Sequence, residues 1–200
     1  VLTDPIGSFI KFIINALLLQ SWFPNEHIWL SYNSVTWFLS TLVFLCIFII
    51  PLHHICSYIE KHSHAVGIYA VILVVDWLMV FAVAFLLSTH CDNIKYYLYA
   101  FPPIRLMDYT SGFVLGRVFV HQRNNKSVCR KATYLEIAAV GVIMGYLVIF
   151  PYVPEAFSRA AIYQPGAAFV IYVFAMGKGT ISHFLSSPPM VRLGGNTLYY

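Results

Sequence analysis

The chain has 200 residues, of which 60% are hydrophobic, 17% aromatic and only 10% charged. Soluble domains average about 45–50% apolar and about 25% charged residues, so this composition excludes an ordinary soluble globular domain. The formal net charge is +4, but the basic residues lie in short segments between long apolar blocks. That distribution indicates membrane topology rather than a nucleic-acid partner.

The N-terminal part of the chain predicts an interfacial helix followed by a first span. Residues 6–20 are apolar but contain Lys11 and Asn15, which favours a partly embedded helix. A polar, aromatic connector from Trp22 to Tyr32 comes next. A first complete span is expected at about residues 34–55, because such a block has the roughly 20 apolar residues that a membrane-crossing helix needs.

A polar stretch after this span is expected to be a short loop. It contains several histidines together with charged residues, and its spacing matches no tight metal-ligand pattern, so no metal is predicted. The polar residues of this stretch are His53, His54, Glu60, Lys61, His62 and His64.

The second span, at about residues 66–88, contains Asp76 in its middle. A carboxylate in mid-span costs at least about 2.5–3.5 kcal/mol on insertion scales, so Asp76 should face a partner or a wet cavity. A functional interpretation is a proton relay or a contact to an acceptor hydroxyl. A structural one is a buried pair or hydrogen bond to a neighbouring helix, and the sequence leaves both open.

The third helix is expected at about residues 105–121, after a loop that ends in Pro102-Pro103. Proline suits the first turn of a helix. Arg105 and Asp108 lie one helical turn apart near the outer end of this helix. They could hold a polar substrate at the mouth of a cavity, or they could be an ordinary interfacial pair.

The rest of the chain predicts a basic segment at 122–131, two further spans at about 133–151 and 166–184, and a sixth span that is cut off near Tyr200. The predicted fold is therefore an all-α, polytopic transmembrane helix bundle with about five complete spans plus a truncated sixth. We interpret residues 1–200 as one domain that is incomplete at both ends.

Orientation follows from the basic residues of alternating loops, because loops rich in Lys and Arg stay in the cytoplasm. The residues assigned to the cytoplasmic face are Lys61, Arg117, Arg123, Lys126, Arg130, Lys131, Lys178 and Arg192, and those assigned to the outer face are Lys11, Lys95, Arg105 and Arg159.

Two small-residue motifs and one basic cluster have structural and functional interpretations. Gly112 with Gly116, and Gly141 with Gly145, are spaced so that neighbouring helices can approach closely, which predicts helix packing. The basic cluster is explained by topology, but it could also bind the phosphates of a cytosolic cofactor or anionic lipid headgroups. Its members are Arg123, Lys126, Arg130 and Lys131.

Three stretches together resemble acyltransferase family 3, the integral membrane acyltransferases that O-acylate surface polysaccharides. The first is LQSWFP at 19–24, followed by WFLS at 37–40 and Pro51. The second is PIRL at 103–106, followed by Tyr109, Gly112 and Gly116. The third runs from Ser187-Pro188 through VRLGG at 191–195 to Leu198-Tyr199. Leu42 stands where many family members have a glutamate.

The resemblance implies acyl transfer from a cytosolic acyl-CoA, such as acetyl-CoA, to a hydroxyl of a surface polysaccharide or lipid-linked sugar. It implies that Trp37 and Ser40 line the cavity, that Asp76 relays protons, and that Arg105 with Asp108 holds sugar hydroxyls. The family's early catalytic helices are not in this chain, so activity is expected of the full-length parent in a bacterial inner membrane and not of these 200 residues alone.

Two other classes of function remain open. A transporter or flippase of lipid-linked glycans would have broken helices and a repeat that relates its two halves. A purely structural membrane subunit would have no solvent-linked polar cavity around Asp76. The sequence predicts a bilayer as a partner, the resemblance implies a glycan, and the oligomeric state is left undetermined.

Overall fold

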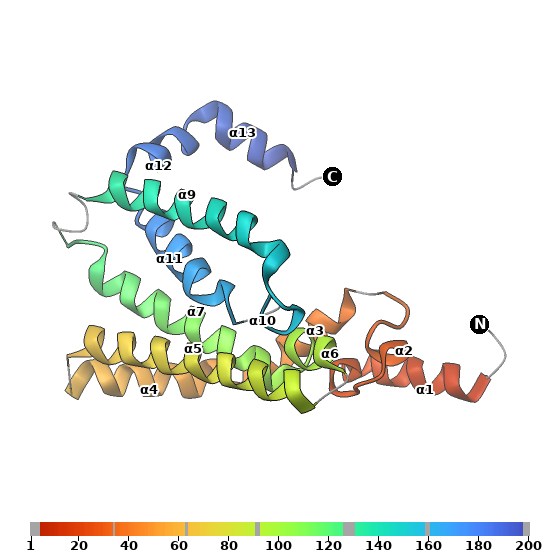
Figure 1. Cartoon of the computed structure of the whole chain (residues 1–200). Helices are drawn as coiled ribbons and strands as arrows, with labels where there is room; N and C mark the ends of the chain where they lie inside the picture. Colours follow the sequence, from red (N-terminus) through yellow and green to blue (C-terminus); the bar gives the residue numbers. More distant parts are fainter. Residues whose placement is uncertain are drawn as a thin grey trace. The chain divides into compact units, whose positions relative to one another are not determined.

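The computed structural model of the chain describes residues 5–33, 35–62, 64–90, 93–125, 131–158 and 161–197. Within these ranges every regular element is an α-helix or a short 3-10 helix (Figure 1), so the predicted all-α class is confirmed. The chain divides into two compact units. Unit 1 contains residues 1–114 and 154–162, and unit 2 contains residues 115–153 and 163–200.

Unit 1 combines two long helices with short helices and tight connectors. Its elements are α1 (Pro5–Ala16), the 3-10 helix η1 (Gln20–Trp22), α2 (Glu26–Trp29), α3 (Thr36–Ile47), α4 (Ile49–His62), α5 (Ala65–His90), α6 (Ile94–Tyr99), the first part of α7 (Pro102–Gln122) and α10 (Glu155–Ser158). Helix α7 begins at Pro102, as the paired prolines predict. The first N–H groups of a helix have no intrahelical acceptor, so proline loses nothing there.

Helices α3 and α4 form a pair that is bent by 44°. Pro51 lies in the first turn of α4. It has no N–H to continue the hydrogen-bond ladder from α3 into α4, and its ring crowds the preceding turn, so the helix bends here. The predicted loop after the first span is wrong for residues 53–62, because α4 continues to His62. Polar and basic residues at the C-terminal end of a helix suit its negative dipole end.

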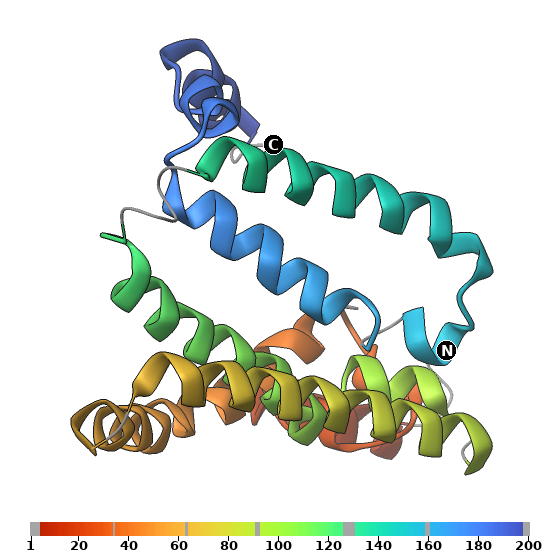
Figure 2. The same cartoon turned by 60° about the vertical axis from the view of Figure 1, so that its left-hand side comes forward.

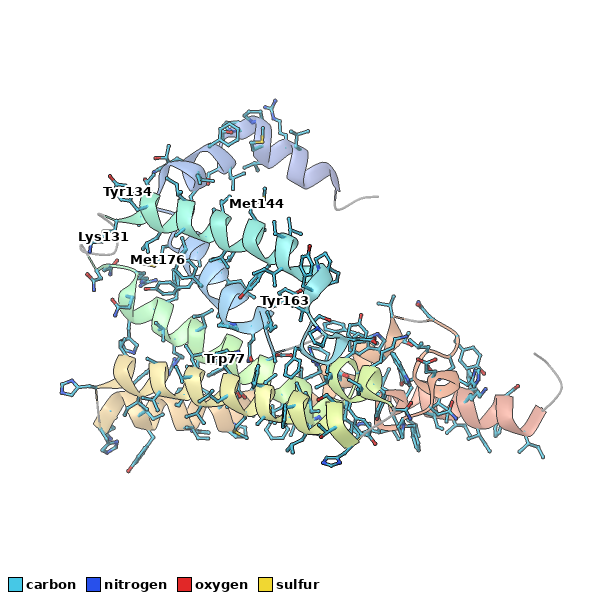
Figure 3. The ribbon with its side chains drawn as sticks, viewed as in Figure 1. Trp77, Lys131, Tyr134, Met144, Tyr163 and Met176 are labelled. Carbon is cyan, nitrogen blue, oxygen red and sulfur yellow. The ribbon has the colours of Figure 1, made fainter. Side chains whose placement is uncertain are left out.

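Helix α5 is the longest element of unit 1, with 26 residues, and it lies beside α4 (Figures 1 and 2). A buried tyrosine joins the two helices: the Tyr69 hydroxyl donates to the backbone carbonyl of Cys56 at 3.1 Å and contacts Oε1 of Glu60 at 2.9 Å. The opposite end of α5 contacts α6 and α10. The indole N–H of Trp77, labelled in Figure 3, donates to the carbonyl of Ala161 at 2.7 Å.

The apolar core of unit 1 lies where its connectors meet. Buried residues from α5, α6, α7 and the 154–162 segment form one cluster, and aromatic residues of α2 and α6 form a second. The clusters consist of Val80, Ala84, Leu98, Ile104, Ala156 and Ala161, and of Trp29, Tyr96 and Ala100. The apolar core of unit 1 therefore joins α5 to its short helices and connectors.

Unit 2 is built on a pair of helices. Its elements are the remainder of α7, α9 (Ala132–Ile149), the 3-10 helix η2 (Phe150–Tyr152), α11 (Tyr163–Met176), α12 (Thr180–Leu185) and α13 (Pro188–Thr197). Helices α9 and α11 lie side by side in both views (Figures 1 and 2). They approach closely at Gly166, where an added Cβ would lie 2.2 Å from the ring of Tyr146.

The predicted span at 166–184 is interrupted. Helix α11 ends at Met176, Gly177 has φ +58°, and a separate helix begins at Thr180. A left-handed residue after the last helical turn is a common helix stop, and glycine adopts it without a steric cost.

In the described ranges, two helices are long and apolar enough to cross a membrane, α5 and the 132–152 helix, or three if the bent α3–α4 pair counts as one span. This is fewer than the five complete spans predicted. Helix α7 has 21 residues but carries Arg105, Asp108 and Arg117, and α11 has only 14 residues. The predicted blocks were long enough to cross a membrane. However, charged residues make α7 less apolar, and the helix stop at Gly177 shortens α11.

Candidate functional site

A buried polar network ties the connector after α1 to helix α3. Helix α1 ends at Ala16 and is followed by Leu18 in the left-handed region (φ 55°), and the N–H of Leu19 donates to the carbonyl of Ile14 at 2.9 Å. This is the hydrogen-bond pattern of a Schellman motif, in which glycine is the usual left-handed residue. The Ser40 hydroxyl of α3 donates to the Leu18 carbonyl at 2.6 Å, which holds the chain in this strained turn.

Two residues of the connector are fully buried and face α3. The hydroxyls of Ser21 and Ser40 are 2.6 Å apart, and Nε2 of Gln20 donates to the carbonyl of Thr36 at 2.8 Å. Oε1 of Gln20 is buried without a hydrogen-bond partner. Because a buried amide oxygen without a partner costs free energy, this atom lowers the stability that the connector gains from the network.

Helix α6 extends the network. The Tyr96 hydroxyl donates to the carbonyl of Ser21 at 2.9 Å, and Thr41 of α3 donates through Oγ1 to the carbonyl of Ala100 at 3.2 Å. Burial raises the pKa of the Tyr96 phenol, and the neighbouring Tyr97 raises it further. Tyr96 therefore stays protonated and remains a hydrogen-bond donor in alkaline solution.

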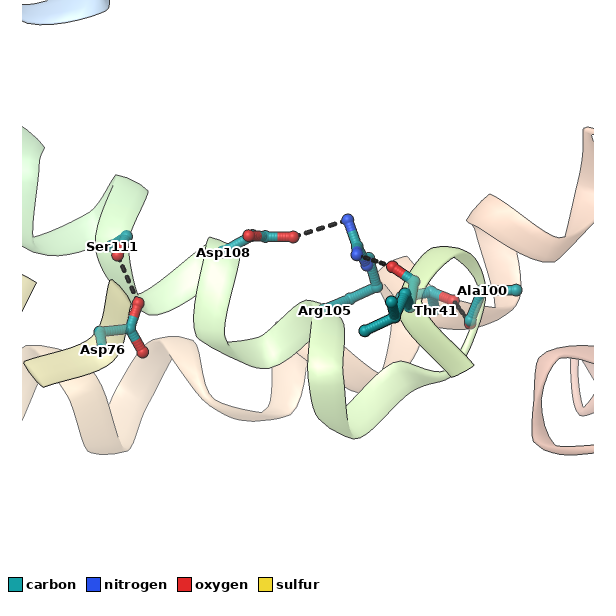
Figure 4. Close-up of polar contacts among 7 residues, drawn as sticks. Thr41, Asp76, Ala100, Arg105, Asp108 and Ser111 are labelled. Carbon is teal, nitrogen blue, oxygen red and sulfur yellow. Dashed lines mark hydrogen bonds and ion pairs between the residues drawn. The ribbon is translucent and has the colours of Figure 1, made fainter. Parts of the chain in front are cut away.

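Arg105 and Asp108 form an ion pair at the start of α7, shown in Figure 4. Nη1 of Arg105 lies 2.6 Å from Oδ2 of Asp108, and the two side chains are 19% and 34% exposed. Nη2 of Arg105 donates to the carbonyl of Leu98 on α6. Nε of Arg105 is buried without a partner. The pair keeps hydrogen-bonding capacity on both members, while its net charge is close to zero.

Asp76 contacts the neighbouring helix. The hydroxyl of Ser111 on α7 donates to Oδ2 of Asp76 on α5 (Figure 4). Ser111 is buried and Asp76 is half-buried. The contact supplies the interhelical hydrogen bond of the structural interpretation, and a role as a proton relay stays a prediction.

The remaining predicted site residues lie in different surroundings. Trp37 is half-buried with its ring centroid 4.6 Å from that of Tyr99. In the predicted phosphate-binding cluster, Arg123 and Lys131 are exposed, whereas the other two members, Lys126 and Arg130, lie outside the described residues.

The glycines of the two predicted packing motifs have open space beside them. No described atom outside their own helix lies within 4 Å of an added Cβ at Gly112, Gly116, Gly141 or Gly145. Their packing role stays a prediction. The tight glycine contacts of the described residues are at Gly166 and Gly179, which the sequence motifs did not indicate.

The sequence reading missed one buried acid, Glu136 on α9, which is 0% exposed. Its carboxylate accepts hydrogen bonds from the backbone N–H groups of Gly179 at 3.0 Å, Ile181 at 2.8 Å and Ser182 at 3.3 Å, and from the Ser182 hydroxyl. We call this arrangement the Glu136 clasp. A lone carboxylate in an apolar block was the available signal, the same one that singled out Asp76.

The described residues contain no group of three or more His, Cys, Asp or Glu side chains that could hold a metal ion. The charged and polar groups of unit 1 form hydrogen bonds and two ion pairs, Arg105–Asp108 and Lys95–Glu26. Such groups can orient a hydroxyl-bearing ligand and can stabilise charge that develops on an oxygen.

In the part of the chain that the structure describes, the fold is all-helical, and two helices, or three if the bent α3–α4 pair is one span, are long and apolar enough to cross a membrane. Comparison of the chain with protein-family models, curated proteins and solved structures gave no match.

Proposed function

We propose that the chain is part of a membrane-embedded O-acyltransferase, which moves an acyl group from cytosolic acyl-CoA to a hydroxyl of a surface polysaccharide or lipid-linked sugar. The donor is acetyl-CoA or a close analogue. In this proposal the apolar helices lie in a bacterial plasma membrane, and the connectors of unit 1 face away from the cytoplasm.

One observation carries the proposal. Polar residues of two stretches that resemble the acyltransferases, far apart in the chain, belong to one continuous set of contacts in unit 1. Ser21 meets Ser40 at 2.6 Å, and Tyr96 of α6 donates to the Ser21 carbonyl. The same helix α6 supplies the Leu98 carbonyl to Arg105. These motif residues therefore belong to one contact network, and that network includes the partly exposed Arg105–Asp108 ion pair.

The proposed role of the Arg105–Asp108 pair is to orient the acceptor. Asp108, at 34% exposure, can accept from a sugar hydroxyl, while Arg105 stays fixed by Leu98 and Asp108. When the acceptor hydroxyl is already held in place at the membrane surface, less of its freedom of motion is lost on the way to the transition state. The activation barrier of acyl transfer is therefore lower.

The test uses the full-length parent in membranes with isotopically labelled acetyl-CoA on the cytosolic side. Transfer is measured as label on glycan hydroxyls by mass spectrometry. Arg105→Lys keeps the charge but loses the planar fork, so we expect transfer to fall at least about tenfold at unchanged protein abundance. Lys61→Arg, a charge-preserving exchange at an exposed position at the end of α4, is the control and should leave transfer unchanged. A parent that labels no glycan with any acyl-CoA would sink the proposal.

A second candidate is a transporter of lipid-linked glycans, and the bent α3–α4 pair favours it, since broken helices are typical of transporters. The same membranes separate the two candidates. A transporter would move the glycan across the bilayer without any label appearing on it.

A further inference from the structure

A cavity of about 640 Å³ lies between α1, α2 and the turn that follows α2. This volume is within the range of about 300–1,000 Å³ that is usual for small-molecule sites. Most of the lining side chains can form hydrogen bonds. The lining residues are Ser8, Lys11, Glu26, His27, Leu30, Ser31 and Tyr32.

The cavity wall is held in place by hydrogen bonds within the chain. The Tyr32 hydroxyl donates to the carbonyl of Ser8 at 3.0 Å, and Tyr32 itself has a left-handed backbone with φ 59°. The Ser31 hydroxyl accepts from Nδ2 of Asn15 at 2.7 Å and donates to the carbonyl of Ile28 at 2.6 Å. A wall that is already ordered loses little conformational entropy when a ligand binds.

The charges on the wall do not cancel. Glu26 is paired with Lys95 of α6 at 3.3 Å, which leaves this carboxylate neutralised. Within the described ranges, the ammonium group of Lys11 has no acidic partner. Lys11 is also half-buried, so solvent screens its charge less than at an open surface. A ligand with a negative charge near Lys11 would compensate it.

We propose that this cavity binds an acidic sugar, whose carboxylate pairs with Lys11 and whose hydroxyls contact Glu26, His27 and Ser31. The inference rests on the proposed function and names the acceptor class, a glycan that contains uronic acid. Helix α6 links the two places in unit 1, because Lys95 holds Glu26 on the cavity wall while the Leu98 carbonyl holds Arg105.

The test measures binding of D-glucuronate to the full chain in an uncharged detergent by saturation-transfer NMR, with D-glucose as the neutral probe. We expect glucuronate to bind and glucose to bind at least about tenfold more weakly, because only glucuronate carries a carboxylate that can pair with the Lys11 ammonium group. Lys11→Gln should weaken glucuronate about tenfold without affecting glucose. Lys61→Gln, an exposed lysine at the end of α4, should change neither.

Three outcomes would overturn the proposal. The first is equal binding of glucose and glucuronate, the second is glucuronate binding that Lys11→Gln leaves intact, and the third is no binding of either sugar. Displacement of glucuronate by phosphatidylglycerol in mixed micelles, but not by phosphatidylcholine, would assign the cavity to an anionic lipid headgroup instead. Labelling of a neutral glycan by the parent would leave the acyltransferase intact while this inference fails, so the two can be told apart.

Discussion

The two units hold their polar groups in opposite ways. Unit 1 distributes its buried polar contacts over several connectors, with single hydrogen bonds such as Ser21–Ser40 and Thr41–Ala100. Unit 2 concentrates several hydrogen bonds on one carboxylate, Glu136. A distributed network should lose little from any one substitution, whereas a concentrated one should depend on a single residue.

The largest expected effect is at Glu136. Glu136→Ala would leave the N–H groups of Gly179 and Ser182 buried without their acceptor, so we expect a loss of at least about 3 kcal/mol in the free energy of unfolding. Denaturant titration in detergent micelles measures it. Tyr134→Phe, on the same helix at 77% exposure (Figure 3), is the control and should change little. A loss for Glu136→Ala no greater than that for Ser40→Ala would remove the contrast between the units.

The α9–α11 contact should be the next most sensitive. Gly166→Ala places a Cβ against the Tyr146 ring, and overpacking of this kind costs about 1–3 kcal/mol. Adding Tyr146→Leu to Gly166→Ala should recover part of that loss, measured by the same titration.

Gly145→Ala is the matched control, because nothing lies within 4 Å of its added Cβ. Alanine is the better helix former by up to about 1 kcal/mol, so this variant should be neutral or stabilising. A clear destabilisation would instead support packing of the Gly141 and Gly145 motif against a neighbouring helix.

The helix stops of the two units sharpen the comparison, since both use a left-handed residue. Gly177→Ala should cost about 1–2 kcal/mol, because a side chain is strained at φ +58°. Leu18→Gly should change the free energy of unfolding by less than about 0.5 kcal/mol, because relief of strain offsets the lost contacts of a half-buried side chain. Thermal unfolding of both variants checks the difference, and equal losses would contradict it.

The hydrogen bond between Ser21 and Ser40 tests whether the stability of unit 1 is spread over many buried polar contacts. We expect each alanine variant to cost about 1 kcal/mol, with a coupling of about 0.5–1.5 kcal/mol in a double-mutant cycle. Ser88→Ala, at an exposed position on α5, is the control and should cost less than about 0.5 kcal/mol. A coupling near zero would mean that the two hydroxyls do not act together.

The effect expected at Tyr96 depends on pH and grows in alkali. The raised pKa of Tyr96 means that the folded state keeps its proton where the unfolded chain loses it. The stability from this group is fully present below about pH 10 and is lost as pH rises through the folded pKa. Tyr96→Phe should therefore lessen the fall in stability between pH 9 and 11, followed by denaturant titration. An unchanged slope would contradict the buried donor.

Local rules predicted part of this structure, and long-range contacts account for what they missed. The start of α7 at Pro102 and the all-α class follow from local rules. The stop at Gly177 was missed because a glycine inside an apolar block does not reveal its φ angle. The continuation of α4 to His62 was missed because polar residues are compatible with both a loop and a helix end.

Only part of the candidate site was predicted: Ser40, Asp76, Arg105 and Asp108 were named, whereas Gln20, Ser21 and Tyr96 and most contact partners were not. Arg105 and Asp108 form the pair that their spacing allowed. The partner of Asp76 is Ser111, 35 residues away, and nothing in one sequence indicates such a contact. Glu136 carried a readable signal, yet its partners are backbone groups, which leave no trace in side-chain patterns.

In the Glu136 clasp, the carboxylate binds mostly backbone N–H groups, and this limits which positions can be substituted during evolution. Three of the four donors are amide groups that nearly any residue supplies. The clasp therefore places little restriction on the side chain at position 181. Position 136 must stay acidic. Position 179 must stay glycine, since a Cβ there would lie 2.2 Å from the carboxylate. Among descendants of this sequence, those two sites should be lost or kept together.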